Sequence, residues 1–466
     1  MSAACALAEA GLRVQLVERR GYLGGRASSY RHPGVDEVID NCQHVLFGCC
    51  TNLIGFYRRI GVADRIHWTR TMTMIEPGGQ RSVLGPSWLP APLHGLPSLL
   101  TAKALAREDK KALMRAFSAV LKIDPKGCST QSLGTWLRLN GQTPGAIDRF
   151  WRLVIASALN ADVDEIALPY AAKVIRELFL NSAEAGAMGM SSVPLSELYV
   201  GTEQFLRERG SEVVFNAGVG SAEWDEETSL WTLRTRPGEL VADYLVLALP
   251  FEAMAKLLPQ MPPAEGAEAL AEQIDRQEHG PICSVHLWFD REITELEHAV
   301  LLDREIHWMY NKSRLQPGRN GKGSYLELVV SASHRFAALS REEAIELALV
   351  ELKEFFPAVA GAKLEKAALV KEVRATFTVP PGIDAARPGS TSPWPHCVLA
   401  GDWIATGWPS TMESAARSGH LAAEAVCTAL GDRRKILNAD LKPRGLMRFI
   451  GTGNREQGTG NRKTEE

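Results

Sequence analysis

The sequence lacks the features that mark several large classes of protein. No apolar run approaches the roughly 18 residues needed to cross a bilayer, and the apolar start has no basic segment and is interrupted by Glu9, unlike a signal peptide. The eight cysteines are scattered over 466 residues and form no CxxC pair and no zinc-spaced group. A net charge of −3 gives no reason to expect nucleic acid. We therefore expect a globular, cytoplasmic protein with free thiols and no metal.

A further absence concerns the dinucleotide-binding unit, which needs a strand, a GxGxxG turn, a helix and a second strand that ends in an acid. The alanine-rich residues 2–10 predict a helix that ends before Gly11. Residues 12–18 predict a strand that ends at Glu18, whose carboxylate suits ribose hydroxyls. The first strand and the GxGxxG turn are expected to be missing. Two interpretations stay open: a mis-placed start or truncated gene, or a different fold with a chance match.

Downstream, helical and strand patterns follow one another. Residues 40–61 predict a helix, residues 86–101 are apolar but broken by prolines, and the segments up to 121 and from 131 to 185 predict mostly helix. Strand patterns dominate from residue 212, with an amphipathic helix at 341–356, a buried strand at 396–403 and a long helix at 411–430. The polar, glycine-rich tail from residue 451 predicts disorder.

Glycines and an arginine follow the predicted acid in the stretch ERRGYLGGR, residues 18–26. Two glycines let backbone approach a ligand closely, and an arginine offers donors to a pyrophosphate or a carbonyl. The stretch resembles the ERxxxxGGR signature of flavin amine oxidases and phytoene desaturases. The resemblance implies FAD as cofactor, bound by Glu18, Arg19, Gly24, Gly25 and Arg26. The alternative is a glycine turn with a surface arginine.

A second stretch of the same kind lies near the C-terminus, where a predicted strand ends in Gly401 and Asp402 before a helix. It resembles the second FAD motif of the same superfamily, in which the Asp bonds the ribityl chain and the helix N-terminus faces the phosphate or the flavin edge. The alternative is a buried αβ unit. Val219 is implied to meet the adenine through its backbone. The remaining predicted cofactor residues are Ser410, Thr411, Met412 and Glu413.

The order of these signals predicts an α/β fold with a split, Rossmann-like FAD-binding domain and an interleaved α+β substrate domain. The FAD-binding parts are residues 1–75, 201–260 and 391–432. The substrate domain is mostly helical at 76–200 and contains strands and a helix at 261–390. Residues 433–466 are predicted to hold a C-terminal helix and the disordered tail.

A narrower resemblance rests on DNCQHVL at 40–46, GCCTN at 48–52, ALN at 158–160, MG at 188–189, PLSELY at 194–199 and GDWIATGWPSTMESAARSG at 401–419. These stretches resemble squalene-associated FAD-dependent desaturases, the hydroxysqualene dehydroxylases of hopanoid biosynthesis. The resemblance implies reduction of hydroxysqualene to squalene, with loss of water and oxidation of bound FADH2. It also implies an apolar isoprenoid as binding partner and contact with other hopanoid-pathway enzymes.

Loss of an allylic hydroxyl as water leaves a delocalised cation that takes a hydride from reduced flavin, so the protein must supply a proton and exclude water. We predict Asp40 and His44 as the catalytic candidates, with Asn41 and Gln43 holding the hydroxyl and Tyr199 as a further substrate-binding residue. His44 fits a hydrogen-bonded core histidine equally well. Asp40 fits the N-cap of the following helix equally well.

A substrate of thirty carbons needs a long apolar tunnel. Residues 86–101 predict an entrance that dips into a membrane, followed by basic residues for anionic head groups, namely Lys103, Arg107, Lys110 and Lys111. A covered flap before a solvated helix is the alternative.

Three other functions stay open. A carotenoid-type desaturase would run electrons from lipid to flavin, and an amine oxidase would need an aromatic cage, for which Trp403 and Trp408 are the nearest candidates. The third is a non-catalytic isoprenoid carrier or an inactive fragment.

Overall fold

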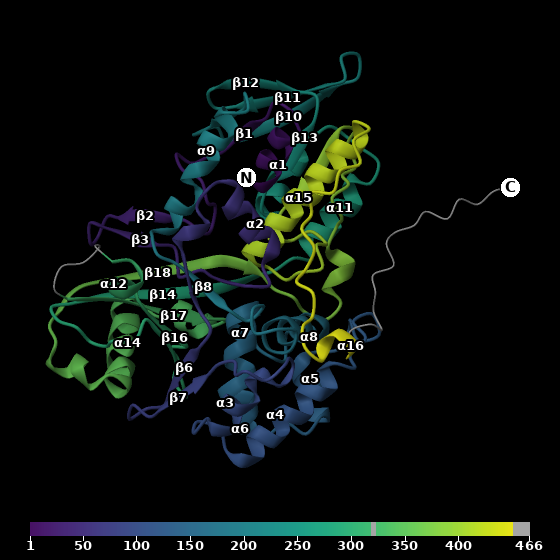
Figure 1. The fold of residues 1–466 in the computed structure, drawn as a ribbon. Helices are drawn as coiled ribbons and strands as arrows, with labels where there is room; N and C mark the ends of the chain where they lie inside the picture. The colour runs from purple at the N-terminus through teal and green to yellow at the C-terminus, as the bar shows by residue number, and fades with distance from the viewer. Residues whose placement is uncertain (318–322, 451–466) are drawn as a thin grey trace.

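The structure is a computed structural model that describes residues 1–317 and 323–450 (Figure 1). It confirms the predicted α/β class, with short parallel strand pairs, a large mixed sheet and a layer of helices. The tail predicted to be disordered from residue 451 lies outside the described residues. Within them, no helix combines the length and the apolar character needed to span a bilayer.

The dinucleotide half contains two parallel strand pairs. Strand β1 (Gln15–Val17) pairs with β9 (Glu212–Val214), and β13 (Leu245–Ala248) pairs with β19 (Cys397–Ala400). Helix α1 (Ser2–Glu9) packs on α15 (Met412–Ala429) and on α9 (Val200–Arg207). These contacts bring together three parts of the chain that are far apart in sequence. In the described residues, no strand lies between β1 and β13, and both line the same cavity.

A three-stranded antiparallel sheet covers the end of this half, at the top of Figure 1. It consists of β10 (Val219–Asp225), β11 (Leu230–Thr235) and β12 (Gly238–Ala242).

The largest sheet has seven strands in the order β18-β14-β17-β16-β15-β6-β7. Their bounds are β18 (Leu364–Phe377), β14 (His279–Phe289), β17 (Ser324–Ser331), β16 (Trp308–Asn311), β15 (His298–Leu301), β6 (Met72–Ile75) and β7 (Arg81–Leu84). Every residue of β17 is buried, and α14 (Arg341–Phe355) packs against β14 and β18. Strand β6 belongs to this sheet although it falls inside the predicted FAD-binding segment 1–75.

Below and to the right of this sheet in Figure 1 lies the helical layer predicted for residues 76–200. Its main helices are α3 (Leu96–Thr101), α4 (Arg107–Val120), α5 (Leu133–Leu139), α7 (Leu153–Leu159) and α8 (Leu168–Ile175). Trp151, Phe150 and Leu137 are buried in its core with their neighbours from α4 and α8. The apolar stripe of each amphipathic helix is covered here by the others.

The helix predicted for residues 40–61 is too long. Only α2 (Thr51–Arg59) is helical, because residues 37–40 pair in the hairpin of β2 (Ser29–His32) and β3 (Glu37–Asp40), and β4 (Val45–Phe47) pairs with β8 (Met188–Ser191). Between them Cys42 has a φ of 66°, which ends any regular element. Asp40 therefore closes a strand and does not cap a helix.

Candidate functional site

A cavity of about 2120 Å³ extends from the two parallel strand pairs into the helical layer. At one end it is lined by β1, the glycine loop and the start of α15, and at the other by α3 and α4. The side chains at the second end are mostly apolar: Leu96, Leu99, Met114, Phe117, Leu121, Phe150 and Val154. The arrangement can hold a large polar ligand and a long apolar one end to end.

The strand pair β1–β9 places the predicted ribose acid. Glu18 follows β1 directly, and its carboxylate accepts a hydrogen bond from the amide of Arg20 at 2.9 Å. Its backbone carbonyl accepts from Ala217 at 2.9 Å, which draws the start of β10 toward it. Glu18, Arg19 and Val219 all line the cavity. The geometry thus groups the residues predicted for the adenosine part of the cofactor.

The glycine loop approaches its surroundings so closely that side chains do not fit. Gly24 has a φ of 118°, and a Cβ there would lie 2.8 Å from the carbonyl oxygen of Ala27 and 2.8 Å from the ring of Tyr199. Gly25 has a φ of 60° and lines the cavity. Both values lie in the left-handed region that favours glycine. Tyr199 is buried behind the loop and does not line the cavity, so its position disfavours the predicted contact with substrate.

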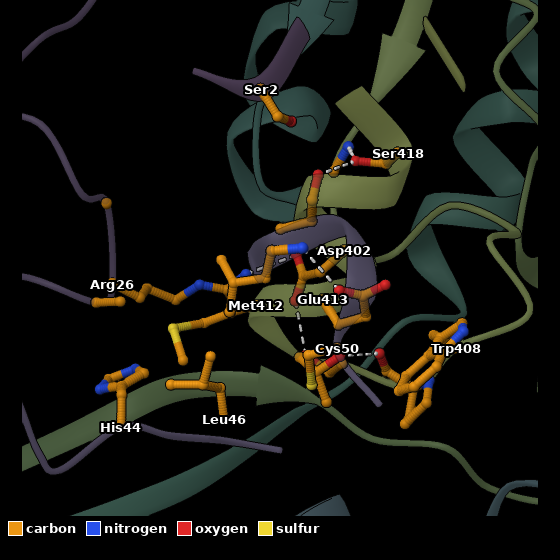
Figure 2. Close-up of a pocket in the computed structure, with 18 of the residues that line it drawn as sticks. Ser2, Arg26, His44, Leu46, Cys50, Asp402, Trp408, Met412, Glu413 and Ser418 are labelled. Carbon is orange, nitrogen blue, oxygen red and sulfur yellow. Dashed lines mark hydrogen bonds and ion pairs between the residues drawn. The ribbon is translucent and has the colours of Figure 1, made fainter. Parts of the chain in front are cut away.

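Arg26 and Asp402, 376 residues apart, form the link between the two predicted motifs (Figure 2). The guanidinium Nη2 lies 2.6 Å from one carboxylate oxygen of Asp402, and Ser410 donates to the other at 2.6 Å. Thr411 caps α15 by accepting the amide hydrogen of Ser414, so the helix N-terminus faces the same region. Gly401, Met412 and Ser410 also line the cavity.

Glu413 lines the cavity, but its carboxylate is bonded to another element. It accepts from the backbone amides of Asn52 and Leu53, the first turn of α2, at 2.8 to 3.2 Å. Burial raises the pKa of Glu413, and these hydrogen bonds oppose that effect. The side chain therefore stabilises the N-terminus of α2, where a negative charge is favourable.

The segment 41–44 brings three predicted residues to the cavity wall. Asn41 donates to the carbonyl of Arg26 and to Glu372, and Gln43 accepts from Lys312 at 2.7 Å. The Nδ1 of His44 lies 3.0 Å from the carbonyl of Cys42. Burial lowers the pKa of His44, so the ring is neutral at neutral pH and Nδ1 carries the proton. The free Nε2 is then an acceptor, which disfavours His44 as the acid.

Asp40 lies outside the cavity lining, in a buried cluster with Lys312 and Glu327. Its carboxylate is 2.5 Å from the Nζ of Lys312 and accepts from Ser29 at 2.6 Å. Burial alone would raise the pKa of Asp40, but the charge and hydrogen bond of Lys312 lower it to about 2. A permanently ionised carboxylate without access to the cavity is unsuited to donate a proton, and the position favours a structural role.

The structure adds a cavity residue that the sequence analysis missed. Glu177 lies in the π-helical turn Arg176–Leu180 after α8, and it lines the cavity with Lys173. Burial raises the pKa of Glu177, and its Oε2 has no hydrogen-bond partner among the described residues. The only signal in the sequence is a glutamate among apolar residues of a predicted helix. Many solvent-exposed helices also contain such a glutamate, so the signal does not single out Glu177.

FAD fits these residues. An acid follows β1, two glycines face the ligand, the N-termini of α1 and α15 line the same cavity, and Arg26 supplies a positive charge. Fold and site define an FAD-dependent oxidoreductase with a split dinucleotide-binding half. All eight cysteines are free thiols, and in the part of the chain that the structure describes no group of three or more His, Cys, Asp or Glu converges as metal ligands.

The chain belongs to the family of flavin containing amine oxidoreductases, whose family model matches residues 1–427. It is 26% identical over 454 residues to the 15-cis-phytoene desaturase of Synechococcus elongatus, covering 91% of this chain and 93% of the relative. It is also 26% identical over 466 residues to the zeta-carotene desaturase of a Synechocystis species, covering 91% and 94%. Putrescine oxidase bound to putrescine shares the fold, with a TM-score of 0.69 at 16% identity over 92% of this chain and 96% of that chain.

Proposed function

We propose that this FAD-dependent oxidoreductase acts on a long, linear isoprenoid. The observation that carries the proposal is the cavity of about 2120 Å³, which continues from the FAD-binding residues into the apolar helical layer. Pockets for compact ligands are on the order of 300–1,000 Å³. The second end has apolar walls over most of its length, so it suits a hydrocarbon chain better than a small polar amine.

Bound FAD supplies a two-electron site that accepts or donates hydride. The names of the two relatives favour desaturation, in which a saturated carbon pair of a carotenoid precursor loses two hydrogens and the flavin is reduced. The residues of this chain would hold the extended substrate and keep water away from the flavin. For that purpose apolar walls suffice, and Leu96, Leu99 and Phe117 provide them.

A second candidate is the reductive dehydroxylation of hydroxysqualene, in which reduced FAD and hydroxysqualene yield squalene, water and oxidised FAD. The observation that favours it is the polar wall formed by Asn41, Gln43 and His44, which a pure hydrocarbon does not need. The free Nε2 of His44 would accept a hydrogen bond from the substrate hydroxyl. Glu177, whose pKa is raised by burial, would provide the proton that leaves with the hydroxyl as water.

The two reactions run in opposite redox directions, so one experiment separates them. Oxidised enzyme is incubated anaerobically with phytoene and a quinone acceptor, and dithionite-reduced enzyme is incubated with hydroxysqualene. A new conjugated chromophore in the first assay identifies a desaturase, whereas squalene with re-oxidised flavin in the second identifies a dehydroxylase. If flavin is bound and neither product forms, the proposal of an isoprenoid substrate is refuted.

The role of Glu177 has its own test within that assay. Glu177→Gln keeps the shape of the side chain but removes the proton, so we expect squalene formation to fall by roughly 10²–10⁴-fold. The exposed Glu203 on α9 offers a matched control in Glu203→Gln. Unchanged turnover in Glu177→Gln would exclude this side chain as the proton donor.

A further inference from the structure

Large apolar side chains are exposed where the loop before α3 meets the end of the described chain. Trp88 is 89% exposed and Phe449, in α16 (Met447–Ile450), is 79% exposed. The amide of Leu446 donates to the carbonyl of Ala91 at 2.8 Å, which fixes the two segments against each other. We call the exposed set the apolar rim: Trp88, Leu93, Leu100, Leu446, Phe449 and Ile450. A grouping of this kind marks a binding surface more often than chance exposure does.

The apolar rim adjoins the large cavity. Pro92, Leu93 and Leu96 line that cavity, and Leu93 is itself part of the rim. In Figure 1, α3 and α16 both lie in the lower half of the molecule, away from the strands β10–β12 at the top. A water-insoluble substrate that leaves a bilayer at this face would therefore pass directly into the apolar end of the cavity.

A second, smaller cavity of about 450 Å³ lies beside the rim and is basic. Arg70, Arg444 and Arg448 line it together with Glu184, which pairs with Arg444 at 2.6 Å. Among the described residues Arg70 and Arg448 have no carboxylate partner. We call this cavity the arginine pocket. One carboxylate against three guanidinium groups leaves a net positive site.

His94 lies at the boundary between the arginine pocket and the large cavity. Its side chain is only 5% exposed and lines both cavities. Its Nδ1 is buried without a hydrogen-bond partner among the described residues. Because His94 lines both cavities, the arginine pocket and the apolar end of the large cavity are neighbours.

We propose that this face docks on an anionic membrane surface, with the apolar rim inserted among the acyl chains and a lipid phosphate in the arginine pocket. Aromatic and aliphatic side chains with arginines beside them are what interfacial binding needs. Arginine binds phosphate with two parallel hydrogen bonds. The inference rests on the proposed function in one respect: the docked face would let an isoprenoid enter the cavity from the membrane.

The test is flotation of the FAD-loaded, full-length protein with vesicles, without any turnover. Vesicles of phosphatidylcholine alone are compared with vesicles that also contain phosphatidylglycerol. We expect clear preference for the second kind, and a loss of roughly 20-fold in binding for Arg448→Glu, since each charge near an anionic surface changes the affinity about fivefold. Trp88→Ser and Phe449→Ser should each weaken binding to both kinds of vesicle.

Matched controls lie at the opposite end of the molecule. Arg236→Glu, in the turn between β11 and β12, and Val241→Ser, on β12, change exposed residues of the same types and should leave vesicle binding unchanged. Equal binding to both kinds of vesicle would overturn the preference for an anionic surface, and Arg448→Glu that binds vesicles as tightly as the wild type would overturn the phosphate site. The docking face would be overturned if the protein does not bind vesicles, or if Trp88→Ser and Phe449→Ser do not weaken binding. Either result would stand even if the protein converts an isoprenoid in detergent, so it would not refute the proposed function.

Discussion

Glu327 on β17 offers the sharpest test of the buried charge cluster. Its side chain is fully buried, and its carboxylate lies 3.4 Å from the Nζ of Lys312 at the start of α12 (Lys312–Leu315). Burial raises the pKa of Glu327 to about 7; Lys312 opposes the rise and the negative charge of Asp40 adds to it. Lys312 is already bonded to Asp40, so one cation serves two carboxylates.

The raised pKa determines how stability depends on pH. Between the ordinary value of 4.5 and about 7, the folded protein keeps a proton on Glu327 that the unfolded chain releases. The free energy of unfolding therefore falls as the pH rises through this window and levels off above it. At about 1.4 kcal/mol per pKa unit the loss amounts to about 3 kcal/mol.

The variant Glu327→Gln cannot ionise, so this loss should disappear. Urea unfolding of the two flavoproteins, followed by tryptophan fluorescence at pH 5 and pH 8, should show the variant gaining about 2.5 kcal/mol relative to the wild type at the higher pH. Glu365→Gln changes an exposed glutamate on the nearby strand β18 and serves as the control. A stability difference between Glu327→Gln and wild type that does not change with pH would refute the reasoning.

Three further substitutions test the FAD-binding residues and their support. Gly24→Ala should lower flavin content per polypeptide, because the new Cβ would overlap the Ala27 carbonyl, whereas Gly21→Ala, whose nearest neighbour would be 3.5 Å away, should bind flavin normally. Asp402→Ala should weaken FAD binding by at least tenfold in a flavin titration, since it releases the arginine and serine that it orders; unchanged affinity would contradict this role. Glu413→Gln should lower the urea midpoint by the equivalent of about 1–3 kcal/mol, because the α2 amides lose a charged acceptor, and an unaltered midpoint would argue against it.

Local sequence was sufficient to predict the elements whose residue pattern is distinctive by itself. The alanine-rich helix α1, the strand that ends at Glu18 and the long helix α15 all form close to the predicted residues. The helix predicted at 40–61 failed in its first half, because β4 finds its partner β8 more than 140 residues away and no local pattern announces that pairing. The predicted roles of Asp40 and Tyr199 also could not be judged from local sequence, because only the fold shows that neither side chain reaches the cavity.

By itself, the sequence determined the kind of cofactor and the class of fold, because glycines, an acid after a strand and a helix N-terminus act through backbone geometry that short motifs encode. Only the tertiary structure decided which side chains share an environment. Lys312 meets Asp40 across 272 residues, and Glu177 faces the cavity from the π-helical turn after α8. Proton affinity depends on burial and on neighbouring charges, and both arise only when distant segments pack.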